Sequence, residues 1–277
     1  MSNRPAQAQS NPLSPFIGAA TLFSLFGLMS ISCIDPADRS IDRADRPAAG
    51  QRRLIGRSVQ GRPIESFTFG NGRDGVLIIA TIHGNEDAGT PLCEKLIDHL
   101  HRNPRLVEDR RVIIIADVNP DGRRNQTRFN VRGVDLNRNF PAGNYNSSGR
   151  HGDKPLSEPE SEALHAVIKR EMPARIISIH QPLNYGSECI DFDGPAEMLA
   201  DAMSGHTDIP VKRIGSRPGS LGSFAGESLG IPIITLELPK DAKGRDAFSL
   251  WQDYGNMLIA AITFPDRHDS LAIDTEP

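Results

Sequence analysis

The chain has 277 residues, 38% of them hydrophobic, and a formal net charge of −4 at pH 7, which suits one large globular domain or two small ones. No block of lysine and arginine interleaved with aromatic residues occurs, which argues against a nucleic-acid-binding protein. The three cysteines, Cys33, Cys93 and Cys189, are too few and too scattered for a disulfide framework or a thiolate zinc site, although a single Cys93–Cys189 bridge stays open.

The N-terminal segment differs from the rest of the chain. Residues 16–32, FIGAATLFSLFGLMSIS, carry no charge, which is the pattern of a secretory signal or a short membrane anchor over residues 1–33. Cys33 stands where a bacterial lipoprotein signal places its lipidated cysteine, although Ser30 replaces the usual aliphatic residue. A polar tether over residues 34–51 follows, which fits poorly with the alternative of a buried helix. We therefore predict an exported protein, periplasmic or membrane-anchored, with membrane contact only through this segment.

Strand and helix patterns alternate after the tether. Residues 52–70 predict two short strands around a turn. Four nearly continuous runs of isoleucine, valine and leucine predict strands covered on both faces, at 75–82, 111–118, 174–179 and 231–238. Helices are expected near 88–102, 157–171, 194–204 and 246–263.

The order of these elements predicts the fold class. A single α/β domain is expected over residues 52–265, with a mixed, largely parallel, doubly wound sheet flanked by helices. Ser157 and Glu160 fit a capping box at the start of the second helix. Residues 266–277 are expected to be a polar tail.

Residues able to bind a metal follow the predicted strands. His83 and Glu86 come after the first long run, His180 comes after the third, and Glu237 lies near the end of the fourth. In open α/β sheets, ligands bind outside the carboxyl ends of the strands. Two histidines and one carboxylate with an open fourth position describe a catalytic zinc site. Each residue alone has an ordinary explanation: the HxxE pair of His83 and Glu86 can arise by chance, and His180 can simply end a strand. The prediction therefore rests on their shared position at the carboxyl ends of the strands.

A set of ordered motifs resembles the zinc carboxypeptidase family, peptidase family M14. Between about Arg53 and Phe264 the chain contains IGRSVQGRPI (55–64), HGNE (83–86), NPDG (119–122), GVDLNRNFP (133–141), SIHQP (178–182) and TLELP (235–239), in family order. The resemblance implies a zinc carboxypeptidase-like fold with one zinc ion per chain. It also implies that His83, Glu86 and His180 bind the zinc and that Glu237 is the general acid/base.

The resemblance extends to residues that contact the substrate. Arg128 matches the arginine that stabilises the tetrahedral oxyanion, with Arg132 as its competitor because the match rests on spacing to GVDLNRN. Asn137 and Arg138 match the pair that binds the terminal carboxylate of the substrate. Without the resemblance, residues 123–133 would be interpreted as a solvated basic loop.

One departure from the family concerns specificity. Digestive carboxypeptidases carry a mobile tyrosine at a position that holds Ile214 here, which puts a digestive specificity in doubt. GDKPLSEPESEAL (152–164) and PGSLGSF (218–224) are more similar to bacterial murein tripeptide amidases, which cut the γ-D-glutamyl–diaminopimelate bond of cell-wall peptides.

Several residues in the segment after His180 and in the loop around His151 have no role assigned by the motifs. Cys189 also resembles that amidase branch and is interpreted as a small packed residue, since no base is placed to activate it. Asp191 and Asp193 either contact the amino group of diaminopimelate or are solvated loop acids. His151 is expected to be a loop histidine.

The sequence therefore predicts a zinc-dependent metallopeptidase or amidase that hydrolyses a peptide bond next to a carboxylate-bearing residue, with a murein fragment as the expected substrate. One alternative is a metallocarboxypeptidase that releases C-terminal amino acids, and another is a deacylase of the aspartoacylase type. A third is a non-catalytic binding module that keeps the fold. The GVDLNRNFP and NPDG motifs favour the peptidase, and the intact Glu237 and metal-ligand positions count against the binding module.

Overall fold

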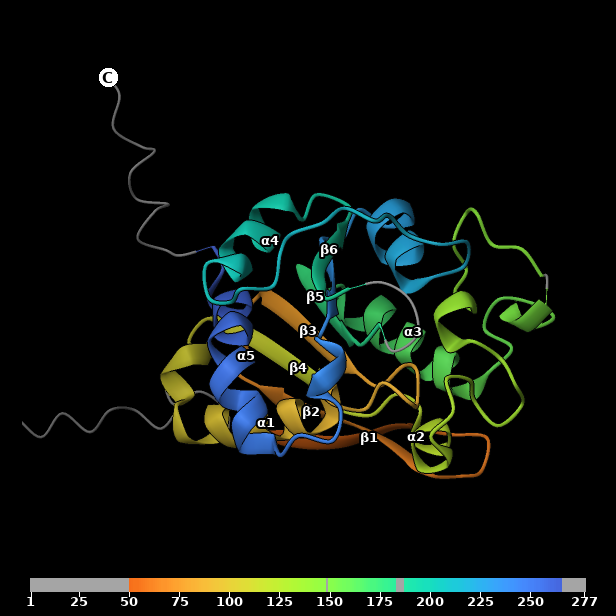
Figure 1. Ribbon diagram of the computed structural model, residues 1–277, viewed down its shortest axis with the longest axis horizontal. Helices are drawn as coiled ribbons and strands as arrows, with labels where there is room; N and C mark the ends of the chain where they lie inside the picture. Colours follow the sequence, from red (N-terminus) through yellow and green to blue (C-terminus); the bar gives the residue numbers. More distant parts are fainter. Residues whose placement is uncertain (1–49, 148, 183–186, 266–277) are drawn as a thin grey trace, which may run out of the picture. The chain divides into compact units, whose positions relative to one another are not determined.

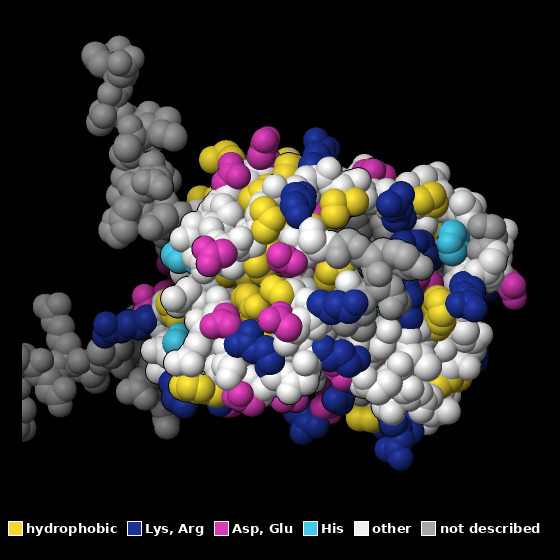
Figure 2. Space-filling model, in the orientation of Figure 1, with side chains coloured by type: hydrophobic (Ala, Val, Ile, Leu, Met, Phe, Trp, Pro, Cys, Tyr) yellow, Lys and Arg dark blue, Asp and Glu magenta, His cyan; other side chains and the backbone are white. Residues whose placement is uncertain are grey.

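Residues 50–147, 149–182 and 187–265 are described by a computed structural model (Figure 1). The predicted signal or anchor, Cys33, nearly all of the tether and the polar tail lie outside the described residues. Of the helices in the described ranges, none is both long and apolar enough to cross a membrane. On the face drawn in Figure 2, acidic and basic side chains are interspersed with small apolar patches.

A seven-stranded sheet organises these residues (Figure 1). In spatial order its strands are β1 (Gln51–Arg57), β2 (Pro63–Phe69), β4 (Arg110–Ile115), β3 (Asp74–Ala80), β5 (Arg175–His180), β7 (Ile233–Glu237) and β6 (Cys189–Asp193). The four central strands run parallel, whereas β1, β2 and β6 pair antiparallel at the two edges. The predicted mixed sheet with a largely parallel centre is confirmed.

Helices cover both faces of the sheet, as the doubly wound prediction requires (Figure 1). The helices are α1 (Gly89–Arg102), α2 (Pro120–Asn125), α3 (Pro159–Glu171), α4 (Glu197–Ser204) and α5 (Ala247–Thr263). Helices α1, α4 and α5 share one apolar core with the sheet, and α3 packs in a second core on the other face. Side chains alternate along a strand, so Val76 and Ile78 of β3 enter the first core while Leu77 and Ile79 enter the second. Burial on both faces explains the continuous apolar runs.

The predicted capping box at Ser157 is wrong. Helix α3 begins at Pro159 with Glu158 at the N-cap position, and no side chain caps it. Ser157 Oγ instead accepts a hydrogen bond from Asn139 Nδ2 at 3.0 Å and donates one to Glu158 at 3.0 Å. Glu160 accepts a hydrogen bond from the backbone N–H of Val59. Tertiary partners thus take both side chains that the local pattern assigned to the cap.

Apart from the short helix α2 and several short 3₁₀ helices, two elements occur where no strand or helix was predicted. Strand β6 contains Asp191 and Asp193, which are buried, so the interpretation of these residues as solvated loop acids is wrong. The second element is a π-helix, η5 (Gly222–Ser228), which lies against β6. A Cβ atom on Gly222 would lie 2.2 Å from Asp193 Oδ2, so only glycine allows this close approach.

The two cysteines in the described ranges are both free and buried, which closes the question of a Cys93–Cys189 bridge. Burial raises the pKa of the Cys189 thiol to about 11, and the nearby charge of Glu237 adds to the shift. Cys189 therefore stays protonated at neutral pH, in line with a packed rather than a reactive residue.

Buried arginines attach the last turn of α5 to the sheet. Arg175 forms a two-pronged ion pair with Asp74 at 2.7 and 2.9 Å, and it donates to the carbonyl oxygens of Ala261 and Ile262. Arg110 donates to the carbonyl oxygen of Thr263. The last carbonyl groups of a helix have no partner within it and carry partial negative charge. The guanidinium groups satisfy these oxygens and join α5 to β3, β4 and β5.

We expect Arg175→Ala to lower the free energy of unfolding by about 3–5 kcal/mol, because it leaves the buried carbonyl groups and part of the Asp74 charge without a partner. Urea denaturation at pH 7 measures this loss. Arg170→Ala is the matched control: its side chain is 44% exposed and pairs with Glu171, so it should cost at most about 1 kcal/mol. Equal losses in the two variants would contradict the structural role of Arg175.

Candidate active site

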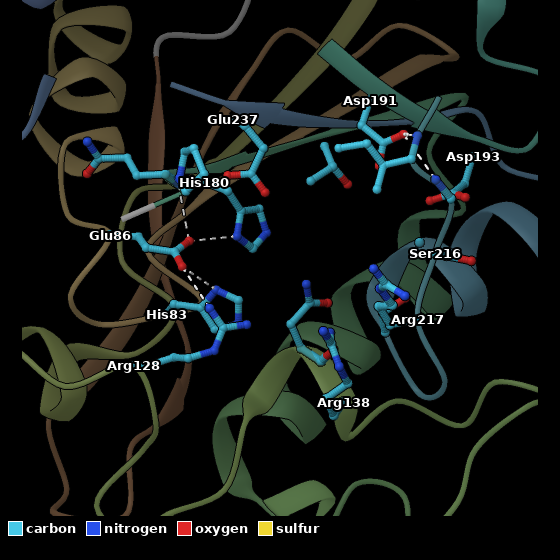
Figure 3. A pocket seen from close by; sticks show the side chains of 18 of the residues that line it. His83, Glu86, Arg128, Arg138, His180, Asp191, Asp193, Ser216, Arg217 and Glu237 are labelled. Carbon is cyan, nitrogen blue, oxygen red and sulfur yellow. Dashed lines mark hydrogen bonds and ion pairs between the residues drawn. The ribbon is translucent and has the colours of Figure 1, made fainter. Parts of the chain in front are cut away.

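The carboxyl ends of the central strands bring three metal-binding side chains together (Figure 3). His83 and Glu86 follow β3, and His180 is the last residue of β5, the neighbouring strand. All three are buried, and their ligand atoms lie within 4.8 Å of one another. Glu86 Oε1 lies 3.0 Å from His83 Nδ1, and Glu86 Oε2 lies 2.9 Å from His180 Nδ1. This cluster could hold one metal ion.

The turn after β3 directs His83 into the site. Thr81 has a positive φ of 56°, an unusual conformation for a β-branched residue, and its hydroxyl lies 2.8 Å from that of Thr90. Gly84 packs against the NPDG turn, because a Cβ atom there would lie 2.0 Å from the carbonyl carbon of Gly122. The glycines of the two motifs therefore allow their backbones to touch.

A second layer of side chains holds the cluster in place. Asp135 Oδ1 lies 3.0 Å from His83 Nε2, and Asp135 Oδ2 accepts a hydrogen bond from Arg128 Nε at 3.1 Å. Arg128 also donates to Glu86 Oε1 at 2.9 Å, and the backbone N–H of Gln181 donates to Glu86 Oε2 at 3.2 Å. Three of these contacts fix the orientation of a candidate ligand directly, and the hydrogen bond between Arg128 and Asp135 holds two of the supporting side chains together.

Charges in the cluster reinforce one another. Burial alone would lower the pKa of His83, but the carboxylates of Glu86 and Asp135 outweigh it and raise that pKa to about 9. Burial alone would raise the pKa of Glu86, yet His83 and His180 hold it well below its usual range. Glu86 therefore stays ionised, as a metal ligand must be.

The donor set fits a metal ion such as zinc. Two imidazoles and one carboxylate are typical zinc ligands. Within the described ranges, His180 Nε2 is a buried nitrogen atom without a hydrogen-bond partner, and His83 Nδ1 has only the contact with Glu86 Oε1. A buried polar atom with no partner is unfavourable. A metal ion in the cluster would relieve this cost for an imidazole that binds it.

Glu237 faces the cluster from the end of β7 (Figure 3). It pairs with His180 in the register of β5 and β7. Its Oε2 atom is buried and has no hydrogen-bond partner in the described part of the chain. Burial raises the pKa of Glu237, and the charge of Glu86 adds to the shift. A raised pKa suits a carboxylate that takes up and releases a proton near neutral pH.

A cavity of about 680 Å³ contains all seven residues that the sequence analysis proposed for the site. They are His83, Glu86, Arg128, Asn137, Arg138, His180 and Glu237. Arg132 does not line the cavity, and its guanidinium lies 3.5 Å from Glu158 instead, so the geometry favours Arg128 over its competitor. Ile214, which the sequence analysis matched to the tyrosine position of digestive carboxypeptidases, lies on the wall of the cavity.

The two residues predicted to bind the carboxylate of the substrate, Asn137 and Arg138, lie on the wall of the cavity. Arg138 is half-buried, and burial lowers the pKa of its guanidinium, with the nearby charges of Arg128 and Arg217 adding to the shift. Asn137 accepts a hydrogen bond from the backbone N–H of Leu221 at 2.8 Å, which fixes its amide on the cavity wall. His151 contacts Asn146 outside the cavity, as expected of a loop histidine.

Sequence reasoning missed three functional residues. Asp135 stands inside the quoted GVDLNRNFP motif, and an acid between a basic loop and a predicted ligand was the available signal. Gln181 follows His180 directly, and its side chain joins Ala88 to Pro239 by hydrogen bonds at 3.2 and 3.3 Å. Arg217 lines the cavity from a loop with no local pattern that marks it as functional.

Comparisons with known proteins agree with this geometry. The family model described as Peptidase M14, zinc carboxypeptidase, matches residues 43–187. The chain is 36% identical to murein peptide amidase A of Escherichia coli strain K12 in an alignment 203 positions long, which covers 66% of this chain and 79% of that protein. It is 29% identical to the carboxypeptidase N catalytic chain of Homo sapiens in an alignment 163 positions long, which covers 48% of this chain and 36% of that one.

Solved structures show the same relationship. The crystal structure of a murein-tripeptide amidase from Escherichia coli O157 superposes with a TM-score of 0.62 and 30% identity, covering 81% of this chain and 97% of that one. A carboxypeptidase A from Helicoverpa armigera superposes with a TM-score of 0.60 and 19% identity, covering 79% of this chain and 70% of that one, and so shows a shared fold.

We expect Asp135→Ala to weaken Zn²⁺ binding by roughly 10–100-fold, because His83 loses the carboxylate that orients its ring. Titration against a competing chelator measures the affinity. Asp153→Ala removes an exposed acid that does not line the cavity and should leave the affinity unchanged. An affinity that is the same in both variants would show that Asp135 does not support the cluster.

Proposed function

This chain belongs to the zinc carboxypeptidase family, and from that premise we propose that it hydrolyses the γ-D-glutamyl–diaminopimelate bond of murein peptides. Members of this family are zinc-dependent hydrolases. The observation that carries the proposal is that one cavity is lined by the cluster of metal-binding side chains, by three arginines and by Glu237, whose Oε2 atom is buried and has no hydrogen-bond partner among the described residues.

We assign the zinc to His83, Glu86 and His180. When bound there, zinc supplies Lewis-acid polarisation of the scissile carbonyl group. The chain itself orients the ligands: Asp135 holds the His83 ring, and the backbone N–H of Gln181 holds one oxygen of Glu86. The site is therefore built before the substrate arrives.

Proton transfer falls to Glu237 in this proposal. Its carboxylate takes a proton from the attacking water and then passes it to the nitrogen of the leaving amine, so that the C–N bond breaks without expelling an amide anion. The pKa raised by burial suits both steps. Arg128 lies beside Glu86 and supplies positive charge where the carbonyl oxygen becomes negative.

Asn137 and Arg138 hold the carboxylate of the residue that is released. A guanidinium fork matches the two oxygens of a carboxylate, and burial strengthens the attraction because water screens it less. This contact sets the distance between the carboxylate and the bond that is cut.

The choice of a murein peptide over an ordinary one has two supports. The amidases of Escherichia coli and Vibrio campbellii are matched over 66% of this chain, at 36% and 31% identity. The tyrosine position of digestive carboxypeptidases holds Ile214, whose side chain cannot donate a hydrogen bond. Release of common C-terminal amino acids is the second candidate function, because carboxypeptidases are also among the similar chains.

One experiment tests the substrate and the base together. The zinc-loaded protein is incubated with L-Ala–γ-D-Glu–meso-diaminopimelate and with an α-linked tripeptide that ends in a common L-residue, and the products are identified by mass. We expect kcat/KM to be at least about tenfold higher for the murein peptide. Equal values for the two peptides would favour the carboxypeptidase.

On the murein peptide, Glu237→Gln should lower kcat by roughly 10²–10⁴ because the amide keeps the shape but cannot accept the proton. Zinc content should stay that of the wild type. Glu162→Gln, on the exposed side of α3, is the control and should keep full activity. An unchanged kcat in Glu237→Gln would remove Glu237 from the mechanism.

Export of the protein is a further proposal, supported by the uncharged run 16–32 and the polar tether after it. We expect the full-length protein to fractionate with membranes or periplasm. Cys33→Ser separates lipidation from simple cleavage, since only a lipoprotein would lose its membrane attachment. Full-length protein recovered in the cytosol at its native length would show that the segment is not an export signal.

A further inference from the structure

The cavity has a second charged end, away from the metal cluster (Figure 3). Asp191 and Asp193 of β6 line it on one side, and Ser216 and Arg217 line it from the loop that follows Ile214. Acidic and basic side chains thus border the same end of one cavity. The mechanism of bond cleavage uses none of them.

The two aspartates hold the loop that carries Arg217. Asp191 Oδ1 accepts hydrogen bonds from the backbone N–H groups of Ile214 at 2.7 Å and Gly215 at 3.4 Å. Asp193 accepts from Ser216, and its carboxylate lies against the glycines of η5. The loop also pairs with β6 through a bridge between Ile190 and Val211. The carboxylates are therefore fixed in position.

These aspartates have no ion-pair partner among the described residues. Both are buried, with 6% and 5% of their surface exposed. Burial raises the pKa of Asp193 to about 6, and the charges of Asp191 and Glu227 add to the shift. A cationic group bound beside Asp193 would relieve this repulsion and stabilise its ionised form.

Arg217, at the same end of the cavity, is a cation that lacks an anionic partner among the described residues. Within the described ranges no carboxylate pairs with its guanidinium, and the charged group that it influences is another cation, Arg138. Two guanidinium groups at one cavity repel each other unless anionic groups bind them. Arg138 is already assigned to one carboxylate of the substrate, so Arg217 is available for a second.

We propose that Asp193 and Arg217 form a subsite for the far end of the side chain of the released residue, and that this end bears both an ammonium and a carboxylate group. Asp193 binds the ammonium and Arg217 binds the carboxylate. The inference rests on the proposed amidase function, because diaminopimelate has such a side chain: it ends in a second amino-acid centre. Lysine offers only the ammonium, and common apolar residues offer neither group.

Four synthetic peptides with the same γ-D-glutamyl donor test this subsite. The released residue is meso-diaminopimelate, its derivative with the distal carboxylate amidated, 2-aminopimelate, which lacks the distal amine, or L-lysine. For the wild type, we expect kcat/KM to fall by roughly 10–100-fold when either distal group is missing, as for loss of a hydrogen bond between charged groups.

Two variants assign the contacts. Arg217→Ala should lower kcat/KM on the diaminopimelate peptide by roughly 10–100-fold and leave the amidated and lysine peptides unchanged. Asp193→Asn should lower it on the peptides with the distal amine and leave the 2-aminopimelate peptide unchanged. Arg213→Ala is the control, because Arg213 lies on the same exposed loop but stacks over Phe192 outside the cavity.

The outcomes separate this inference from the proposed function. Equal hydrolysis of the four peptides by the wild type, or an equal loss on all four in Arg217→Ala, overturns the subsite and leaves the amidase intact. No hydrolysis of any peptide overturns both. Arg217 is exposed, so its variant decides the matter even if the buried Asp193 variant fails to fold.

Discussion

The buried carboxylate of Glu86 is the constraint on which the site depends. Its two oxygens contact His83, His180, Arg128 and the backbone N–H of Gln181. An ionised carboxylate is costly to bury unless such partners surround it. These partners come from β5 and from two separate loops, so their meeting requires β3 and β5 to lie side by side and in register. The order of the strands in the sheet therefore makes it possible to bury the ionised carboxylate of Glu86.

Local pattern predicted most of the fold because the central strands are buried on both faces. Their apolar runs carry a signal that needs no knowledge of the partner strand. Strand β6 carries no such signal, because Asp191 and Asp193 interrupt its apolar residues. Aspartate is also rare in β-strands, so its presence argues against a strand. Its acids are stable there because the loop at residues 214–216 supplies hydrogen bonds from more than twenty residues away, to Asp191 from Ile214 and Gly215 and to Asp193 from Ser216. The π-helix η5 was missed for the same reason, as it depends on contact with β6.

The residues of the candidate site also fall into two groups, those that a local pattern predicted and those that depend on tertiary contacts. His83, His180 and Glu237 could be predicted because they stand at strand ends, where topology alone brings them together. Asp135 and Gln181 were missed, because each acts by orienting a neighbour, and orientation depends on distances that the sequence does not contain. The capping box at Ser157 shows the converse. A local motif was present, but Asn139 provided a competing tertiary partner for the hydroxyl.

Strand β6 is the edge of the sheet, and the loop at residues 210–217 pairs along its outer side. The metal-binding residues stand on the inner, parallel strands, whereas the second charged end of the cavity stands on this edge unit alone. Because the edge unit has one neighbouring strand, β7, a change in it need not disturb the order of the inner strands. In our proposal, the residues that select the substrate can therefore change while the metal-binding residues stay the same.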